Sequence, residues 1–368
     1  MIRTSSVLCL FAAVGLVVAV QARAAGDDTP AWNPAGAAAY LDGELDWWST
    51  WPTAARDHGT FCVSCHTVAP YALARPALST ALGEAVPSPQ ARRLFDNVAT
   101  RVRLWNEVAP YYPDQTRGIP KTSESRGTES VMNALVLATR DAGTGALADD
   151  TRMAFANMWA LQMKTGDTDG AWAWLNFRYE PWEAPGSPYF GAAMAAMAIG
   201  TAPGGYASSA DATPGLDRLR AFIASGFDRQ SLFNKLTMIV ASSRLDGIVT
   251  PGQRRATADA VVALQHADGG WSLSGFSNWT RVDETALDTA PDGYATALAV
   301  LALQQADSPA LQPSLTRGLE WLRSHQEASG RWRATSLNKQ RDPASDPARF
   351  MNDAATAYAV LALTTPSH

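Results

Sequence analysis

Two cysteines and a histidine stand within five residues, in the stretch FCVSCHT. Cys62, Cys65 and His66 form the pattern Cys-x-x-Cys-His, which is the attachment signature of c-type haem. In that chemistry the two thiols add to the vinyl groups of the porphyrin, and the adjacent histidine coordinates the iron. Two intervening residues in a helical turn put both sulfurs along one edge of the macrocycle. The sequence therefore predicts haem c bound by Cys62 and Cys65, with His66 as an axial ligand.

Two other uses of the motif stay open from the sequence. In an oxidising compartment Cys62 and Cys65 can close a disulfide. Zinc can bind Cys62, Cys65 and His66, although adjacent Cys and His side chains make an awkward ligand pair and no second pair of ligands is evident.

The iron of such a haem has a sixth coordination position, and its ligand is unknown from the sequence. A Met or His there favours electron transfer, whereas an open position permits chemistry with peroxide or oxygen. Methionine in an Ala-rich core is more commonly a packing residue. The candidates are His58, Met132, Met194 and Met351.

Attachment of haem c occurs outside the cytoplasm, and the N-terminus has the features of a signal peptide. Arg3 is followed by the apolar run Val7–Val20, which is too short to span a bilayer comfortably. We expect residues 1–24 to be a signal peptide and residues 25–368 to be a periplasmic or secreted protein. An uncleaved N-terminal anchor is the alternative.

Cleavage after Ala24 leaves a moderately acidic chain. Losing Arg3 and Arg23 reduces the 30 basic residues to 28, against 35 acidic residues, so the mature net charge is -7. No cluster of Lys and Arg stands out, which argues against nucleic acid as a partner. No later segment is apolar enough for a membrane helix, so no membrane span is expected after cleavage.

Internal repeats run along most of the chain. Gln265 precedes Trp271 by six residues, and Gln326 precedes Trp332 by the same interval. A looser copy, LQMKTGDTDGAWAW, carries four extra residues. Ala-rich apolar segments such as DGYATALAVLALQQ alternate with amphipathic segments such as SLTRGLEWLRSHQ, which is typical of buried helices alternating with half-exposed ones.

This alternation predicts an all-α fold of six helical hairpins in one domain, because strand signals are scarce. Such a series either stacks into an open solenoid or closes on itself. Capping roles are expected for Glu129, Asp292 and Asp353 near predicted inner-helix starts. Outer helices should begin near residues 35, 90, 149, 214, 253 and 313, and inner helices near residues 66, 129, 187, 231, 292 and 353.

The segments QHADGGW and QEASGRW resemble the QW motifs of the squalene–hopene cyclase and prenyltransferase superfamily. The resemblance covers about residues 30–365 and implies an (α/α)6 toroid, in which inner helices ring a central cavity and outer helices surround them. It also implies a structural role for the repeated residues. A Gln amide can bond backbone ends and so tie one hairpin to the next.

The chemistry of that family does not follow from the resemblance. Class II terpene cyclases protonate an alkene with a DxDD motif, which this sequence lacks. Protein prenyltransferases bind zinc through Asp, Cys and His, but here Asp292 is followed by Tyr294 where the Cys is expected, and the later segment MNDAATAYAVLAL has no His. Terpene cyclisation is therefore not expected.

The function predicted from the sequence is redox chemistry by an exported haem c protein, on an apolar small molecule in the central cavity. Whether the protein is an enzyme stays open, with a haem-dependent oxidoreductase as the class that the motif allows. The first alternative is an electron carrier that meets a periplasmic redox partner. The second is a haem-free binding protein in which Cys62 and Cys65 form a disulfide.

Overall fold

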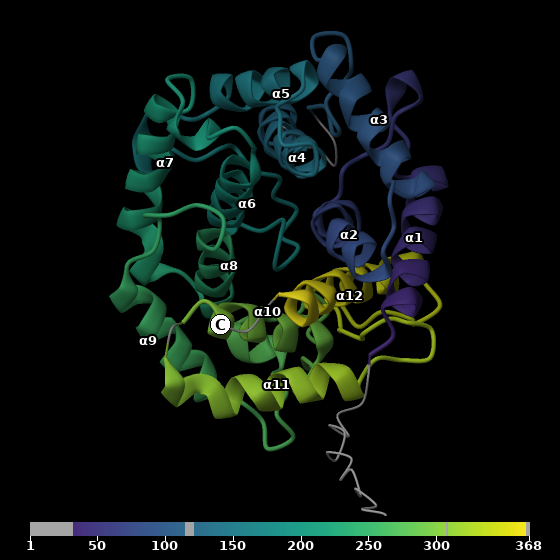
Figure 1. The fold of residues 1–368 in the computed structure, drawn as a ribbon, viewed down its shortest axis with the longest axis vertical. Coiled ribbons are helices and arrows are strands. Elements are labelled where there is room, and N and C mark those ends of the chain that lie inside the picture. Colours follow the sequence, from purple (N-terminus) through teal and green to yellow (C-terminus); the bar gives the residue numbers. More distant parts are fainter. Residues whose placement is uncertain (1–31, 115–120, 307, 366–368) are drawn as a thin grey trace, which may run out of the picture.

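The helices of the described residues form two concentric rings in the computed structural model (Figure 1). The structure describes residues 32–114, 121–306 and 308–365. The outer helices are α1 (Pro34–Thr50), α3 (Pro89–Arg103), α5 (Asp149–Ala160), α7 (Thr213–Gly226), α9 (Pro251–Val262) and α11 (Gln312–Ser324). The inner helices are α2 (Val68–Leu82), α4 (Thr122–Ala142), α6 (Ser187–Thr201), α8 (Leu232–Ser242), α10 (Gly293–Gln304) and α12 (Arg349–Thr364).

The inner ring is closed. Each inner helix packs against the next one along the chain, and α12 packs against α2. The predicted all-α (α/α)6 toroid is confirmed, and the closed ring replaces the open solenoid as the outcome of the hairpin series. In the described residues, β-pairing is limited to two isolated bridges. The predicted signal peptide, residues 1–24, lies outside the described residues.

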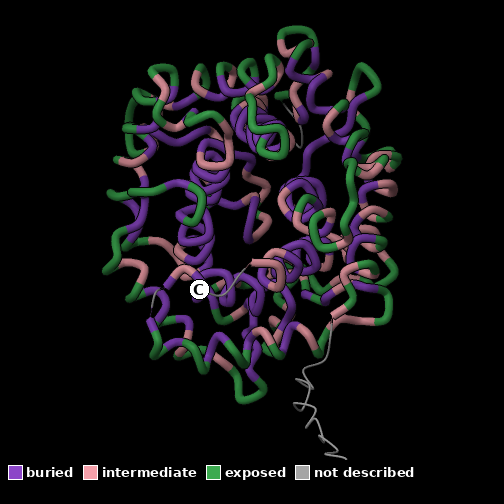
Figure 2. Tube along the Cα trace, in the orientation of Figure 1, coloured by how far each residue is buried: buried purple, intermediate pink, exposed green. Residues whose placement is uncertain are grey.

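Small residues explain how six helices pack around one axis. Every residue of α10 is buried, and most of α6 is buried as well. Alanine and glycine let neighbouring inner helices approach closely, whereas the outer helices bury one face and expose the other (Figure 2). The alternation of Ala-rich and amphipathic segments therefore encodes which ring a helix joins.

Most predicted helix starts agree with the structure within two residues, and α4 and α12 are the exceptions. Helix α4 begins at Thr122 rather than near residue 129, because its first turns carry the polar segment TSESRGT, which an apolar pattern does not reveal. Helix α12 begins at Arg349 rather than near residue 353. Helix α2 begins at Val68, so Cys65 and His66 precede it.

The repeated glutamines join consecutive hairpins, as predicted. Gln265 donates from Nε2 to Gly269 O at 2.8 Å within its own turn and to Ser314 O at 2.9 Å in α11. Gln162 likewise donates from Nε2 to Gly170 O within its own turn and to Gly215 O in α7. Gln326 bonds both ways with the backbone of Asn33, the N-cap of α1, so the last repeat fastens the end of the ring to its beginning.

The repeated tryptophans and glycines complete these turns. Each indole N–H donates to a carbonyl at the end of the preceding outer helix, as in Trp271 Nε1 to Val261 O at 2.7 Å. Gly330 has φ of +90°, and a Cβ there would lie 2.1 Å from Gly36 O. Only glycine combines this conformation with so close a backbone approach.

Among the described residues, no helix is both long enough and apolar enough to cross a membrane.

Candidate functional site

The cysteines lie in the loop that connects α1 to α2. Cys62 and Cys65 are buried and carry free thiols. Cys62 N donates to Ala54 O at 2.9 Å, and Trp48 of α1 donates from Nε1 to Cys62 O at 2.7 Å. The backbone of the motif is therefore fixed by α1 before α2 begins.

A buried arginine of α3 holds the same loop from the other side. Arg101, whose side chain is fully buried, donates from Nη1 to Thr60 Oγ1 at 2.8 Å. Its Nε donates to Glu129 Oε1 of α4 at 2.6 Å. Its Nη1 also lies 3.3 Å from Asp57 Oδ1. The loop, α3 and α4 are thus joined through one guanidinium.

Both thiols are held in the protonated form. Burial raises the pKa of the Cys62 thiol to about 12 and the pKa of the Cys65 thiol well above its usual value. Buried, protonated thiols are poor nucleophiles in their own right. The site is therefore not that of an activated cysteine nucleophile.

Aromatic rings surround His66. Its ring stacks on Phe350 of α12 with centroids 3.8 Å apart and an interplanar angle of 18°. Trp48 approaches edge-on at 5.0 Å, and Trp182 lies at 6.1 Å. These rings remove much of the water around the imidazole, and burial lowers the pKa of His66 to about 3. The imidazole is therefore neutral at physiological pH.

A chain of hydrogen bonds ends on His66 Nδ1. Thr67 Oγ1 lies 2.9 Å from Nδ1 and donates to Asp353 Oδ2 of α12 at 2.5 Å. Tyr40 of α1 donates to Asp353 Oδ1 at 2.9 Å. Burial raises the pKa of Asp353 well above its usual value, and the hydrogen bonds from Thr67 and Tyr40 oppose this shift. In its ionised form Asp353 accepts on both oxygens, so Thr67 Oγ1 accepts from Nδ1–H in that form. Nε2 then keeps its lone pair, which is the form of imidazole that binds a metal.

The donor set fits a c-type haem. It consists of two free thiols separated by two residues and a neutral imidazole whose Nδ1 is already bonded. The cavities described below are not lined by Cys62, Cys65 or His66, so a porphyrin attached to these residues would require the side chains packed around them to move. In the described residues, no group of three or more His, Cys, Asp and Glu side chains is arranged to hold a metal ion.

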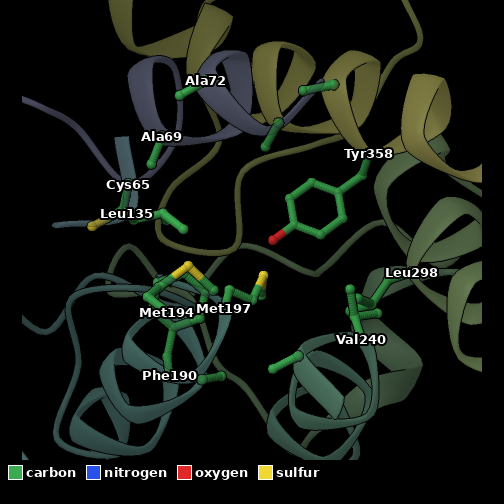
Figure 3. Close-up of a cluster of buried hydrophobic side chains, with 14 of the residues drawn as sticks. Cys65, Ala69, Ala72, Leu135, Phe190, Met194, Met197, Val240, Leu298 and Tyr358 are labelled. Carbon is green, nitrogen blue, oxygen red and sulfur yellow. The ribbon is translucent and has the colours of Figure 1, made fainter. Parts of the chain in front are cut away.

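The four candidates for a sixth iron ligand lie in different surroundings. The side chain of His58 is 41% exposed, and its Nδ1 lies 3.4 Å from Asp57 Oδ2. Met132, Met194 and Met351 are all buried. Met194 of α6 lies in the same side-chain cluster as Cys65 (Figure 3).

The acidic residues near inner-helix starts have different roles. Asp292 is the N-cap of α10 and accepts from Tyr294 N and Ala295 N, as predicted. Glu129 and Asp353 are not caps, because their helices begin one or two turns earlier than predicted. Glu129 pairs with Arg101. Asp353 accepts the hydrogen bonds from Tyr40 and Thr67.

Two adjoining cavities open at the ends of the inner helices opposite to the motif. One, of about 350 Å³, is lined by the C-terminal parts of α6, α8, α10 and α12. The other, of about 680 Å³, lies between α2, α3 and α4. Cys65 shares its cluster with Met197 and Tyr358 (Figure 3), and both of these line the smaller cavity. Buried side chains therefore separate the motif from the smaller cavity.

A line of aromatic side chains connects His66 to the smaller cavity. Trp182, next to His66, donates from Nε1 to Tyr294 OH at 3.1 Å. The rings of Tyr294 and Tyr358 are 5.0 Å apart, and Tyr358 lines the cavity. The loop carrying Trp182, α10 and α12 each supply one member of this line.

Sequence reasoning did not identify the residues that orient His66. Thr67 is the next residue in the chain, and a hydroxyl directly after the motif is the one signal that could have been noticed. Phe350 and Asp353 come from α12, almost the whole chain length away. Their role depends on ring closure, which brings α12 against α2.

Comparison with protein families supports the toroid. A family model described as the squalene-hopene cyclase C-terminal domain matches residues 237–364, from α8 to α12. No curated protein matches the sequence.

Solved structures share the architecture at low sequence identity. The unsaturated glucuronyl hydrolase from Bacillus sp. GL1 is 10% identical, over 89% of this chain and 94% of the hydrolase, with a TM-score of 0.54. An inactive variant of the alpha-1,6-mannanase GH76A of Salegentibacter sp. HEL1_6 is 11% identical, over 90% of this chain and 100% of the mannanase, with a TM-score of 0.53.

A terpenoid synthase is also among the matches. The ent-copalyl diphosphate synthase from Streptomyces platensis is 16% identical over 80% of this chain, with a TM-score of 0.48, and the chain spans 50% of its length. Likeness at these identities concerns the fold alone. The chain is an all-α toroid whose C-terminal part is similar to the squalene-hopene cyclase C-terminal domain.

Proposed function

We propose that the protein is an exported c-type haem protein on a terpenoid-cyclase-like toroid, which exchanges electrons with an apolar ligand in the central cavity. The observation that carries this proposal is the arrangement of His66, with Nδ1 bonded to Thr67 beside two free thiols. A structural histidine in an aromatic core does not require two cysteines at the attachment spacing.

The chain's own residues prepare the site for this cofactor. Cys62 and Cys65 would hold the porphyrin through thioethers, and His66 would bind the iron. When bound, the haem supplies a one-electron Fe(III)/Fe(II) couple. Thr67 and Asp353 orient the imidazole, and Phe350 and the tryptophans around it exclude water. A dry, hydrogen-bonded ligand shell tunes the potential of a haem.

The ligand side of the proposal rests on the smaller cavity. Leu301, Met197 and Val240 give it an apolar wall, and Tyr358 lies in that wall. Trp182 and Tyr294 bridge the distance from Tyr358 to His66 with aromatic rings. In this scheme the ligand would not touch the haem, and the aromatic side chains of Trp182, Tyr294 and Tyr358 would lie between the two.

The test is expression of the full chain in a bacterium that matures c-type cytochromes. We expect the purified protein to show a pyridine haemochrome spectrum and an intact mass equal to that of the chain from residue 25 plus one haem. Cys62→Ser and Cys65→Ser should each lose covalent attachment, whereas the matched change His58→Gln, outside the motif, should retain it. An exported wild-type chain with no Soret absorption and no added mass contradicts the proposal.

The electron-carrier alternative is favoured by one observation, the presence of Met194 in the cluster that contains Cys65 (Figure 3). Thioether ligation of the iron gives a low-spin spectrum that added CO or peroxide does not change. A spectrum that responds to these small ligands excludes this alternative and favours chemistry at the haem.

A further inference from the structure

The two cavities at the C-terminal ends of the inner helices lie side by side. Their linings share five residues, which belong to α2, α6 and α12 and to the segment that follows α8: Leu73, Ala77, Thr201, Arg244 and Leu361. The volumes, about 350 Å³ and about 680 Å³, are in the range of sites for small-molecule ligands. An elongated molecule therefore fits this space better than a compact one.

The lining of the smaller cavity changes from apolar to polar toward its mouth. The inner part is formed by buried side chains such as Met197, Val240 and Leu301. The outer part carries hydroxyl, amide and guanidinium groups at the helix ends: Thr201, Ser243, Arg244, Gln305, Thr364 and Thr365. A ligand that matches this lining is apolar at one end and polar at the other.

Arg244 places a positive charge at the polar mouth of the cavity. It lies two residues beyond α8, is exposed, and its guanidinium makes no ion pair or hydrogen bond with any described residue. The other two arginines that line these cavities are engaged, because Arg75 pairs with Asp42 and Glu84 and Arg140 pairs with Asp141. The positive charge left available at the mouth is therefore that of Arg244.

We infer that these adjoining cavities bind a single-chain amphipathic anion, with its apolar chain among Met197, Val240 and Leu301 and its anionic head group at Arg244. The inference rests on the proposed use of the cavity for an apolar ligand and adds the chemical class of that ligand. The alternative role of Arg244 is to offset the partial negative charge at the C-terminus of α8. That role affects stability but not ligand binding, so the two are separable.

The experiment compares two probes on the full-length, purified protein. One is a fluorescent straight-chain carboxylic acid of roughly 18 carbons, and the other is the uncharged alcohol of the same chain. We expect the wild-type protein to bind the acid more tightly than the alcohol. Arg244→Gln should weaken the affinity for the acid by about threefold or more and leave the affinity for the alcohol unchanged. The matched control is Arg229→Gln, an exposed arginine at the opposite end of α8, which should change neither affinity.

A second variant locates the site. Ser243→Trp places a large ring at the mouth, where the wild-type residue is exposed, so it should block both probes without disturbing the core. Equal affinities for acid and alcohol, an unchanged acid affinity in Arg244→Gln, unimpaired binding in a folded Ser243→Trp, or no binding at all each overturn the inference. Covalent haem is measured by mass on the same samples, so loss of haem with binding retained counts only against the proposed redox function.

Discussion

At the scale of single residues, the neighbours of His66 determine the orientation and hydrogen bonding of its imidazole. The hydroxyl of Thr67 is hydrogen-bonded to Nδ1 of His66, and the same hydroxyl donates a hydrogen bond to Asp353. A histidine that donates from Nδ1 to an oxygen is a stronger donor through Nε2. The hydroxyl that follows the motif is thus part of the proposed haem site, although it touches neither the thiols nor the iron.

Replacing Thr67 by Val removes this hydrogen bond. Because the imidazole then donates less charge to the iron, we expect the haem midpoint potential to rise by tens of millivolts while covalent attachment is retained. Spectroelectrochemical titration measures the potential, and Thr67→Ser, which keeps the hydroxyl, should return it to the wild-type value. An unchanged or lower potential in Thr67→Val contradicts the role of Thr67.

A second residue-scale prediction concerns the pair Arg75–Glu84, whose atoms Nη1 and Oε2 are 2.7 Å apart. Hydrogen bonding to Arg75 lowers the pKa of Glu84 below its usual 4.5. The pair therefore stabilises the fold fully above that pH, and the contribution is lost as the pH falls through the folded-state pKa.

Glu84→Gln should lower the free energy of unfolding by about 1 kcal/mol at neutral pH. The difference from wild type should shrink as the pH falls below about 4.5. Urea denaturation at a series of pH values measures this difference. Glu107→Gln, at an exposed side chain with no ion pair in the described residues, is the control and should show no such dependence. A difference that stays constant down to low pH argues against the pair.

At the scale of elements, buried polar contacts join helices that are distant in the sequence. Arg101 of α3 bridges the motif loop and Glu129 of α4, and both side chains are fully buried. Such a pair contributes little as a pair, but removing Arg101 leaves the buried Glu129 with only the more distant Arg126, 3.6 Å away, as an ionic partner.

Arg101→Met should therefore destabilise the protein by about 3–5 kcal/mol. The double variant Arg101→Met with Glu129→Gln should recover part of this loss, because the buried carboxylate is gone. Thermal and urea unfolding of the three proteins provide the comparison. If the double variant is no more stable than Arg101→Met alone, the cost comes from lost packing around the loop rather than from the unpaired charge.

The repeated Gln residues allow a similar test between elements. Gln326→Ala removes the bonds to Asn33 and Gly330 and should lower the free energy of unfolding by about 1–3 kcal/mol. Gln265→Ala, in the middle of the chain, is the matched variant. Hydrogen exchange in α1 should increase for Gln326→Ala and stay unchanged for Gln265→Ala, because only Gln326 bonds to the start of α1. Equal exchange in α1 for both variants would argue against this closing contact.

At the scale of the whole molecule, ring closure makes the hairpins depend on one another. Helix α12 packs against both α10 and α2, and it supplies Phe350 and Asp353 to the site of His66. An open array of repeats can lose its last unit and keep the others, whereas a closed ring cannot.

A chain that ends at Ala348 lacks α12, one of the twelve α-helices in the described residues, and should lose its cooperative unfolding transition as well as the signal of that helix. Circular dichroism during urea denaturation measures both quantities. A chain that ends at Thr365 keeps α12 and is the control. Cooperative unfolding that survives without α12 would show that the hairpins stack as separable units.

Much of the architecture was predictable because it follows from patterns among residues that are close together in the sequence. Alternating Ala-rich and amphipathic segments predicted six helical hairpins, and the resemblance of the Gln and Trp repeats to QW motifs implied both the rings and the joints between hairpins. The start of α4 was mispredicted because its first turns are polar yet buried against other parts of the ring, including the backbone of Ala173 at Gly127. Periodicity of apolar residues cannot reveal that kind of burial.

The sequence by itself determined the all-α series of hairpins and the joining role of the repeats, because both depend on residues close together in the chain, and its resemblance to a known family implied that the series closes into a toroid. Tertiary structure alone decided what surrounds His66, where the cavity opens and that Arg244 lies at its mouth with no ion pair to another described residue. Those features depend on helices that meet only when the ring closes, so residues near position 350 become neighbours of residues near position 66. No local pattern carries that information, because the packing of the whole inner ring creates the contacts.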